Sequence, residues 1–400
     1  MKKIAIFMVF VICVCTGCLW DNDSQTQQTT PQYEQQMDTP TENETTSSYD
    51  LEQQKEYFLN QKIASMTLEQ KVGQLFFCSF RKDEQNVPIT VCNENIANII
   101  KQYHIGGVVL FGENIDTEQQ TKQLIADIRS HSEIPLFIAI DEEGGRVSRL
   151  HASGKLQVAD VPTAKEIGDT NDTNVSYEYA KIIGSELKEF GFDVDFAPVA
   201  DVNTNENNIV IGDRAFSSDA NIAGEMVVAF IKGLQEQNIS ACVKHFPGHG
   251  DTTEDSHNGI AIANHTLQQM QQVEWIPFQK AIEQNVDFIM AGHITTPNIT
   301  TDGLPASLSY EMLTEQLRNY MHFDGIIITD ALDMGAITKY YENAPFTAIC
   351  AGADMVLMPF ELQKSYETIY HAVKDGTITE QELNQKVKRI LSLKYDKGYF

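Results

Sequence analysis

The sequence predicts an α/β protein whose catalytic domain is a single (β/α)8, TIM-like barrel. Eight short runs rich in β-branched and aromatic residues recur along the chain, and amphipathic helical patterns separate them. Strands that are apolar throughout indicate a parallel sheet covered by helices. Eight strand–helix units in a chain of this length fit a barrel. An open doubly wound sheet is the alternative, because short apolar runs are easily miscounted.

The N-terminus carries the pattern of a secretory signal. "MKKIAIFMVFVICVCTGC" places two lysines before an apolar run that is short for a membrane-spanning helix. Its end is similar to a bacterial lipobox, in which residues 1–17 are removed and Cys18 is lipidated, although Cys15 stands where leucine is usual. An ordinary cleaved signal and an uncleaved anchor are the alternatives. We therefore expect an extracytoplasmic protein that is anchored to the cell membrane by lipid on Cys18.

A polar segment follows the signal. From Asp21 to Asp50 there is no Val, Ile, Leu or Phe. Such a segment cannot bury enough apolar surface to offset its chain entropy, so residues 18–54 are predicted to be a disordered tether. Residues 55–400 remain for one catalytic domain with a full core.

Charge and cysteine content narrow the class of protein. The net charge is −27, with 56 acidic and 29 basic residues, which argues against nucleic acid or anionic lipid head groups as partners. The cysteines outside the signal show no CxxC pairing, and two of them, Cys242 and Cys350, lie in apolar runs and are expected to be buried free thiols. The other two are Cys78 and Cys92. We expect a monomer.

The eight predicted strands can be read in chain order. They are "QLFFCSF" (74–80), "GGVVLF" (106–111), "PLFIAI" (135–140), "FDVDFAPV" (192–199), "SACVKH" (240–245), "VDFIMAGH" (286–293), "DGIIITD" (324–330) and "ADMVLMP" (353–359). Amphipathic stretches such as 117–131 and 267–285 lie between them.

Ionisable residues stand at or just after the ends of several predicted strands. They are Asp141, Asp201, Lys244, His245, His293 and Asp330. In a barrel these positions share one rim, where enzymes of this fold build their sites. A single residue of this kind can instead cap the following helix, but the group together indicates a site.

The stretch "KHFPGHGDTTEDSH" (244–257) is predicted to leave a strand and enter a long polar loop, because Pro247 and its glycine neighbours disfavour a helix. A metal site, an acid–base site and a solvated loop are the possible readings. His245 and His249 have the spacing of a zinc-binding helix, but the proline between them precludes that helix. The sequence therefore favours an acid–base site without a metal.

Seven motifs in order resemble glycoside hydrolase family 3, specifically its β-N-acetylhexosaminidase branch, over about residues 55–395. They are "MTLEQKVGQLFF" (66–77), "IGGVVLF" (105–111), "IDEEGGRVSRL" (140–150), "VDFAPVADVN" (194–203), "IGDRAFS" (211–217), "KHFPGHGDTTEDSH" and "GIIITDALDMGAI" (325–337). Many members of that family carry a second domain. Here little sequence follows the motifs, so no contribution from such a domain is expected.

The resemblance implies a retaining exo-hydrolase that releases terminal β-linked N-acetylglucosamine, typically from peptidoglycan-derived muropeptides, without a cofactor. By position it makes Asp330 the nucleophile, His257 the acid/base and Asp255 the partner of His257. It further implies sugar-binding roles for Asp141, Arg149, Arg214, Lys244 and His245.

The chemistry is consistent with these roles. Glycoside cleavage needs a nucleophile on one face of the sugar and a proton donor on the other. A histidine has a reference pKa near 6.5, and an aspartate two residues away can orient its ring. The planar guanidinium groups of Arg149 and Arg214 can each donate to a pair of oxygens. Their alternative role is a salt bridge to carboxylates such as Asp141 or Asp213. Gly144-Gly145 predicts a tight turn near the ligand.

Three other functions stay open at this point. A β-glucosidase of the same family is one, and an N-acetylglucosaminide phosphorylase is another, because a histidine donor does not repel phosphate as a carboxylate would. A non-catalytic solute-binding lipoprotein is the third, and it would have two α/β lobes joined by crossing strands.

Overall fold

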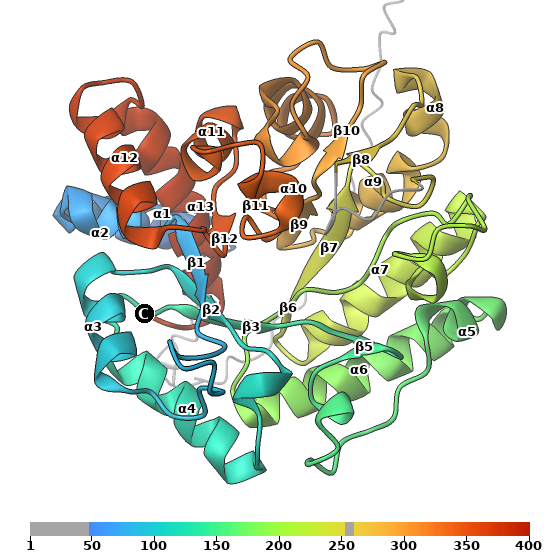
Figure 1. The fold of residues 1–400 in the computed structure, drawn as a ribbon, viewed down its shortest axis with the longest axis horizontal. Helices are drawn as coiled ribbons and strands as arrows, with labels where there is room; N and C mark the ends of the chain where they lie inside the picture. The colour runs from blue at the N-terminus through green and yellow to red at the C-terminus, as the bar shows by residue number, and fades with distance from the viewer. Residues whose placement is uncertain (1–47, 253–259) are drawn as a thin grey trace, which may run out of the picture. The chain divides into compact units, whose positions relative to one another are not determined.

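The structure is a computed structural model that describes residues 48–252 and 260–400. Eight parallel strands follow one another around a central sheet, and helices cover its outer face (Figure 1). The strands are β1 (Phe76–Ser79), β2 (Gly107–Val109), β3 (Phe137–Ile140), β6 (Val194–Asp195), β7 (Ser240–Phe246), β9 (Phe288–Ala291), β11 (Ile326–Thr329) and β12 (Val356–Leu357). Each predicted run contains one of these strands, although β7 continues one residue past its run.

The sheet closes on itself. β12 pairs in parallel with β1, with Phe76 opposite Val356. On its other side, the amide of Thr329 at the end of β11 donates to the carbonyl of Met355, just before β12, at 3.2 Å. The strand order is therefore that of a (β/α)8 barrel, as predicted, and the open doubly wound alternative is wrong.

The α-helices are α1 (Ser48–Ser65), α2 (Leu68–Gly73), α3 (Glu94–Tyr103), α4 (Glu118–Ser130), α5 (Ala164–Asp169), α6 (Thr173–Phe190), α7 (Ala220–Glu236), α8 (Leu267–Gln272), α9 (Trp275–Glu283), α10 (Gly335–Thr338), α11 (Ala344–Ala351), α12 (Leu362–Lys374) and α13 (Glu380–Asp396). Short 3-10 turns and one π-helix complete the connections: η1 (Gly112–Asn114), η2 (His151–Ser153), η3 (Gly212–Arg214), η4 (Ala306–Leu308) and the π-helix η5 (Glu311–Tyr320). Two small sheets lie outside the barrel: β4 (Glu142–Gly144) with β5 (Val147–Ser148), and β8 (Ala261–Ile262) with β10 (Ile294–Thr295).

The interior of the barrel is packed with aromatic side chains from different strands. Phe77 of β1 lies 5.5 Å from Phe196, just after β6, between ring centroids. Phe137 of β3 meets the edge of Phe288 of β9 at 5.6 Å. Because these rings fill the centre, the space for a ligand is left at the rim where the strands end.

Local sequence decides where the helices begin and end. Thr117 caps α4 by accepting a hydrogen bond from the amide of Gln120 at 3.1 Å. The predicted helical stretch 267–285 divides into α8 and α9 around Val273. Pro277 explains the break, because its ring excludes a helical carbonyl at Val273 and it has no N–H to donate.

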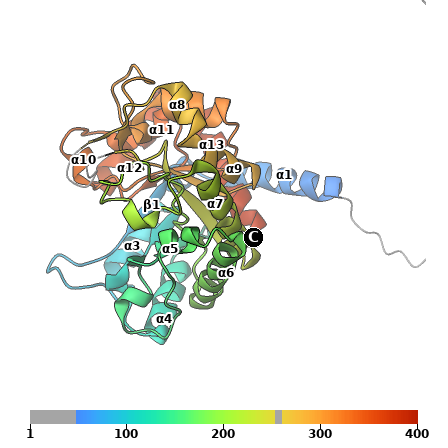
Figure 2. The ribbon, with the colours of Figure 1, turned by 90° about the vertical axis from the view of Figure 1, so that its right-hand side faces the viewer.

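Helix α1 begins inside the segment that the sequence assigns to the tether. Residues 48–54 form its first turns, which extend away from the barrel (Figure 2), because this stretch contains strong helix formers such as Leu51 and Glu52. Its second half packs on α13, where the ring of Phe58 lies 5.1 Å from that of Tyr395. Within the described ranges, no helix has the length and apolar composition needed to cross a bilayer.

The cysteine predictions are only partly correct. Cys242 is a buried free thiol on β7, as expected, but Cys350 is exposed. The apolar run around Cys350 forms α11, and a helix turns some of its residues to solvent even when most are apolar.

Candidate active site

A cavity of about 430 Å³ opens at the carboxyl ends of the barrel strands. Apolar side chains from four strands and their ends line it, among them Val109, Phe196, Met290 and Leu357. Its volume lies within the range of small-molecule sites, roughly 300–1,000 Å³. The predicted nucleophile and all the predicted sugar-binding residues line this cavity: Asp141, Arg149, Arg214, Lys244, His245 and Asp330.

Asp330 directly follows β11. Its amide donates to the carbonyl of Ala291 at 2.8 Å, and its Oδ1 accepts a hydrogen bond from the amide of Ala331 at 2.8 Å. Burial acts to raise the pKa of this carboxyl, but the charges of His293 and His245 outweigh burial and hold the pKa below its usual value. Asp330 is therefore ionised at neutral pH, as a carboxylate nucleophile must be.

His293 does not line the cavity but supports the chain beside Asp330. It is buried, its Nε2 lies 2.9 Å from the carbonyl oxygen of Ala331, and its Nδ1 lies 2.8 Å from Oγ of Ser307. These contacts fix the turn that carries Asp330.

Lys244 lies at the centre of an ion-pair network. Its Nζ is 2.7 Å from Asp141 Oδ1 and 2.6 Å from Glu143 Oε1. Arg214 binds the same glutamate with two parallel hydrogen bonds of 2.8 Å, the geometry in which arginine binds a carboxylate most strongly. Burial opposes ionisation of Glu143, but Arg214 and Lys244 outweigh it and hold its pKa far below the usual range.

His245 is oriented by Asp201. Its Nδ1 lies 2.8 Å from Asp201 Oδ2, while Asp201 Oδ1 accepts a hydrogen bond of 2.6 Å from the amide of His249. Asp201 is 1% exposed and does not line the cavity. It thus acts as a support that directs Nε2 of His245 away from itself.

Both predicted sugar-binding arginines contact rim carboxylates in the structure. Arg149 Nη2 is 3.4 Å from Asp141 Oδ2, which is one of the alternative partners considered from the sequence. The other alternative partner, Asp213, pairs instead with Arg146 at 2.7 Å. Arg214 prefers Glu143, because the side chain of Asp213 is turned toward solvent and Arg146.

Three predicted residues lie outside the described residues: Cys18, Asp255 and His257. The described part of "KHFPGHGDTTEDSH" does leave β7 at Phe246 and continue as an irregular segment, as predicted. In residues 48–252 and 260–400, no group of three or more His, Cys, Asp or Glu side chains is arranged to hold a metal ion.

Glu143, which joins Lys244 to Arg214, was not among the residues predicted from the sequence. The signal was present in "IDEEGG". In an extended chain, Asp141 and Glu143 point to the same side and Glu142 to the other. Glu142 indeed turns away, and its Oε2 accepts hydrogen bonds from the amides of Arg149 and Leu150 at 2.7 and 2.9 Å. The predicted tight turn at Gly144-Gly145 is confirmed, since both have positive φ (87° and 53°).

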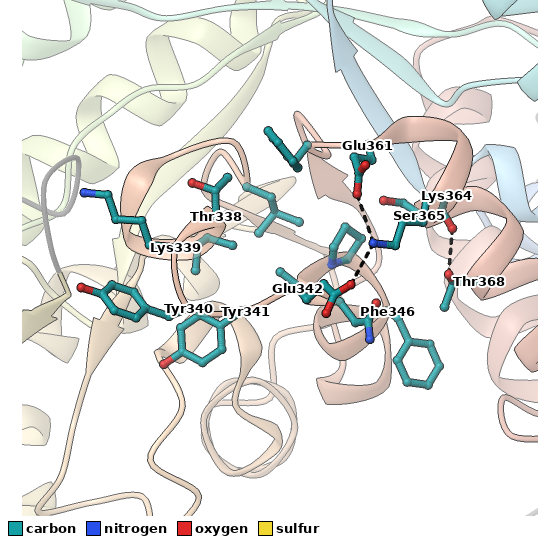
Figure 3. A pocket seen from close by; sticks show the side chains of 16 residues that line it. Thr338, Lys339, Tyr340, Tyr341, Glu342, Phe346, Glu361, Lys364, Ser365 and Thr368 are labelled. Atoms are coloured by element: carbon teal, nitrogen blue, oxygen red, sulfur yellow. Dashed lines mark hydrogen bonds and ion pairs between the residues drawn. The ribbon is translucent and has the colours of Figure 1, made fainter.

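A second, smaller cavity of about 230 Å³ lies between the segments that follow β11 and β12 (Figure 3). Its rim carries aromatic side chains, including Tyr340 and Phe360. Lys364 bridges this rim by pairing with Glu342 at 3.1 Å and Glu361 at 3.2 Å (Figure 3). The side chains of Lys364 and its two glutamate partners are exposed, and no strand-end carboxylate lines this cavity. The cavity at the carboxyl ends of the strands is therefore the better candidate for chemistry.

Comparison with known proteins agrees with this geometry. The N-terminal domain of glycosyl hydrolase family 3 matches residues 67–393. Beta-hexosaminidase A of Pseudoalteromonas piscicida is 32% identical over 374 residues, which cover 82% of this chain and 61% of that protein.

Solved structures are similar as well. A glycoside hydrolase family 3 beta-N-acetylglucosaminidase from Paenibacillus sp. str. FPU-7 superimposes with a TM-score of 0.78 at 35% identity, over 83% of this chain and 63% of that one. LpqI of M tuberculosis superimposes with a TM-score of 0.75 at 28% identity, over 84% of this chain and 96% of that one. The chain thus spans less than two thirds of the length of the first two relatives. The closed barrel and the extent of these matches show that the chain belongs to glycosyl hydrolase family 3.

Proposed function

We propose that the protein is a retaining exo-β-N-acetylglucosaminidase that hydrolyses terminal non-reducing N-acetylglucosamine from peptidoglycan-derived muropeptides or related oligosaccharides. The observation that carries the proposal is the position of Asp330, an ionised carboxylate at a strand end in a cavity otherwise lined by paired charges. The names of two relatives, a beta-hexosaminidase and a beta-N-acetylglucosaminidase, support the choice of sugar.

In this mechanism the carboxylate of Asp330 attacks the anomeric carbon and forms a glycosyl ester, while the bond to the leaving oxygen breaks. His257 donates a proton to that oxygen and then removes one from the water that hydrolyses the ester. Asp255 accepts a hydrogen bond from the other ring nitrogen of His257 and favours the protonated ring. The ester releases the sugar with retained configuration and restores Asp330.

The described carboxylates favour a separate proton donor. Asp141 is paired with Lys244, and Glu143 is paired with Lys244 and Arg214, so both carboxyl groups are engaged in ion pairs. Because the pKa of Glu143 and that of Asp330 both lie below their usual values, neither of these two carboxyl groups holds a proton at neutral pH. A histidine donor supplied from another segment fills this gap.

The remaining polar side chains suit an uncharged sugar. Lys244 and His245 can donate to hydroxyls or to an acyl oxygen. The contact of Arg149 with Asp141 is long, at 3.4 Å, so the guanidinium group of Arg149 can still donate to a pair of sugar oxygens. In this proposal Arg214 contacts the sugar and also keeps Glu143 in place.

The decisive experiment combines substrate and variant. Wild-type protein is incubated with chitobiose and with a muropeptide, with and without phosphate, and the products and their anomeric configuration are followed by NMR. We expect N-acetylglucosamine with retained configuration and no sugar phosphate. Asp330→Asn should lose turnover yet still bind N-acetylglucosamine, because an amide cannot form the ester. Inverted product, or labelling of another residue by a fluorosugar inactivator, would refute the assignment.

The proposal includes the location of the protein. The lipobox-like Thr16-Gly17-Cys18 and the polar segment after it support an extracytoplasmic enzyme anchored by lipid on Cys18. An enzyme held there meets cell-wall fragments directly.

A further inference from the structure

His265 lies between two carboxylates that the proposed mechanism does not use. Its Nε2 is 3.1 Å from Asp251 Oδ2, and its Nδ1 is 3.0 Å from Glu274 Oε1. The three residues come from three segments: Asp251 follows β7, His265 precedes α8, and Glu274 precedes α9. One imidazole therefore connects segments that are separate in the sequence.

Glu274 depends on this contact. It is 1% exposed, and neither of its carboxylate oxygens accepts an aligned hydrogen bond from a described residue. Burial raises its pKa, and the charge of His265 opposes that shift. A buried carboxylate without a partner is costly, and His265 is the side chain that pairs with Glu274.

The segment after β7 passes tightly over Glu274. A Cβ on Gly248 would lie 2.8 Å from Glu274 Cβ, and a Cβ on Gly250 would lie 1.9 Å from the carbonyl oxygen of Val202. Asn208 Nδ2 also donates to the carbonyl of His249 at 2.7 Å. These contacts anchor the chain up to Asp251 on the side of β6 and α9.

The chain that returns toward α8 has a different anchor. β8 pairs with β10, the amide of Ala263 donates to the carbonyl of Thr295 at 3.0 Å, and Asn298 Nδ2 donates to the carbonyl of Asn264 at 2.7 Å. The ion pair between His265 and Asp251 is a direct link between the two anchored ends. In the sequence, Asp255 and His257 stand between these ends.

We propose that His265 is a positioning residue for proton donation. By pairing with both Asp251 and Glu274, it sets the separation of the two chain ends that flank the predicted acid/base pair. The inference rests on the proposed role of His257. Because small misplacements of a catalytic group can cost up to about 100-fold in rate, loss of the link should act on the proton-transfer step first.

The test compares two substrates of one sugar. p-Nitrophenyl N-acetylglucosaminide has an activated leaving group and needs little protonation, whereas chitobiose needs a proton donor. For His265→Ala we expect kcat on chitobiose to fall about 10-fold with KM nearly unchanged, and kcat on the aryl glycoside to fall less than about threefold. Glu274→Gln should show the same direction, and His265→Gln, which keeps one donor, should recover part of the loss.

His151→Ala is the matched control. His151 pairs with Asp160 at 3.4 Å, but their side chains are 44% and 84% exposed, so the loss of His151 should leave both rates unchanged. A purely structural role of His265 would lower the thermal midpoint and reduce both rates alike, and that result would overturn the inference.

A second measurement does not need turnover. Amide hydrogen exchange in peptides that span residues 251–265 should be faster in His265→Ala than in the wild type or in His151→Ala. Unchanged exchange together with an unchanged rate ratio overturns the positioning role while leaving the proposed function intact. A wild type that cleaves neither substrate refutes the proposed function and the positioning role with it.

Discussion

Glu143→Gln should destabilise the protein strongly, although the substitution changes no more than one charge. The side chains of Glu143 and Lys244 are 5% and 3% exposed, and that of Arg214 is 13% exposed. Both carboxylate oxygens of Glu143 accept hydrogen bonds from these cations. The amide NH2 of glutamine would therefore face an N–H group of Lys244 or Arg214 and could not accept from it. Breaking a buried ion pair by removing one partner costs about 3–5 kcal/mol. We expect the lower end, about 3 kcal/mol, because Asp141 still balances Lys244.

The destabilisation should depend on pH with a definite sign. The pKa of Glu143 in the folded state lies below its ordinary value of 4.5, so its stabilising contribution is present above pH 4.5 and is lost as pH falls below that value. The difference between wild type and Glu143→Gln should therefore be largest near pH 7 and shrink at pH 3.5. Urea unfolding at both pH values, followed by circular dichroism, measures it.

The matched control is Glu113→Gln. Glu113 also pairs with an arginine, Arg81, but their side chains are 27% and 45% exposed, and such pairs contribute about 0–1 kcal/mol. A loss below 1 kcal/mol in Glu143→Gln, or a loss that does not change with pH, would refute the reasoning that this glutamate is the charge on which the network depends.

Other predictions concern the base of the barrel and the N-terminus. Lys394 is fully buried, and burial lowers its pKa from 10.5 to about 7; wild-type stability should therefore rise between pH 7 and 10, whereas Lys394→Met should lack this rise in urea unfolding, and parallel profiles would contradict us. Asp354 is buried between Arg318 at 2.7 Å and Arg389 at 2.9 Å, so Asp354→Asn should lower the unfolding free energy by about 3 kcal/mol, and an unchanged urea midpoint would count against this. Cys18→Ala should move the protein from the detergent phase to the aqueous phase or leave it unprocessed; wild-type protein free in the medium with residue 19 or 20 first would argue against lipidation.

The barrel could be predicted because its strands are buried on both faces. Continuous apolar runs such as "DGIIITD" are visible without any partner, and the helices between them have their own period. The ends of parallel strands necessarily meet at one rim, which is why Asp141, Lys244 and Asp330 line one cavity even though up to 189 positions separate them.

What the sequence did not predict depends on tertiary contacts. That Arg214 binds Glu143 rather than Asp213 is decided by which carboxylate is buried. The alternation in "IDEEGG" places Glu143 on the same side as Asp141, but it does not show that Arg214 lies there. The exposure of Cys350 depends on how α11 is rotated against its neighbours, which its nearly uniform apolar composition leaves undetermined. The link between His265 and Asp251 joins positions on either side of a loop, and spacing alone cannot reveal such a contact.

The charge balance of the cavity explains how a strongly acidic protein can keep the proposed nucleophile ionised. Over the whole sequence, acidic residues exceed basic ones by almost two to one. Around the cavity the ratio reverses, with five arginine and lysine side chains against four carboxylates. The positive charges beside Glu143 and Asp141 are largely neutralised by the ion pairs with these carboxylates. The imidazoles of His293 and His245 lower the pKa of Asp330. In this arrangement the proposed nucleophile, Asp330, stays ionised, and no ion pair with another described residue would have to be broken before it attacks. The same imidazoles favour departure of that carboxylate from the glycosyl ester, so both halves of the proposed reaction draw on one arrangement of charge.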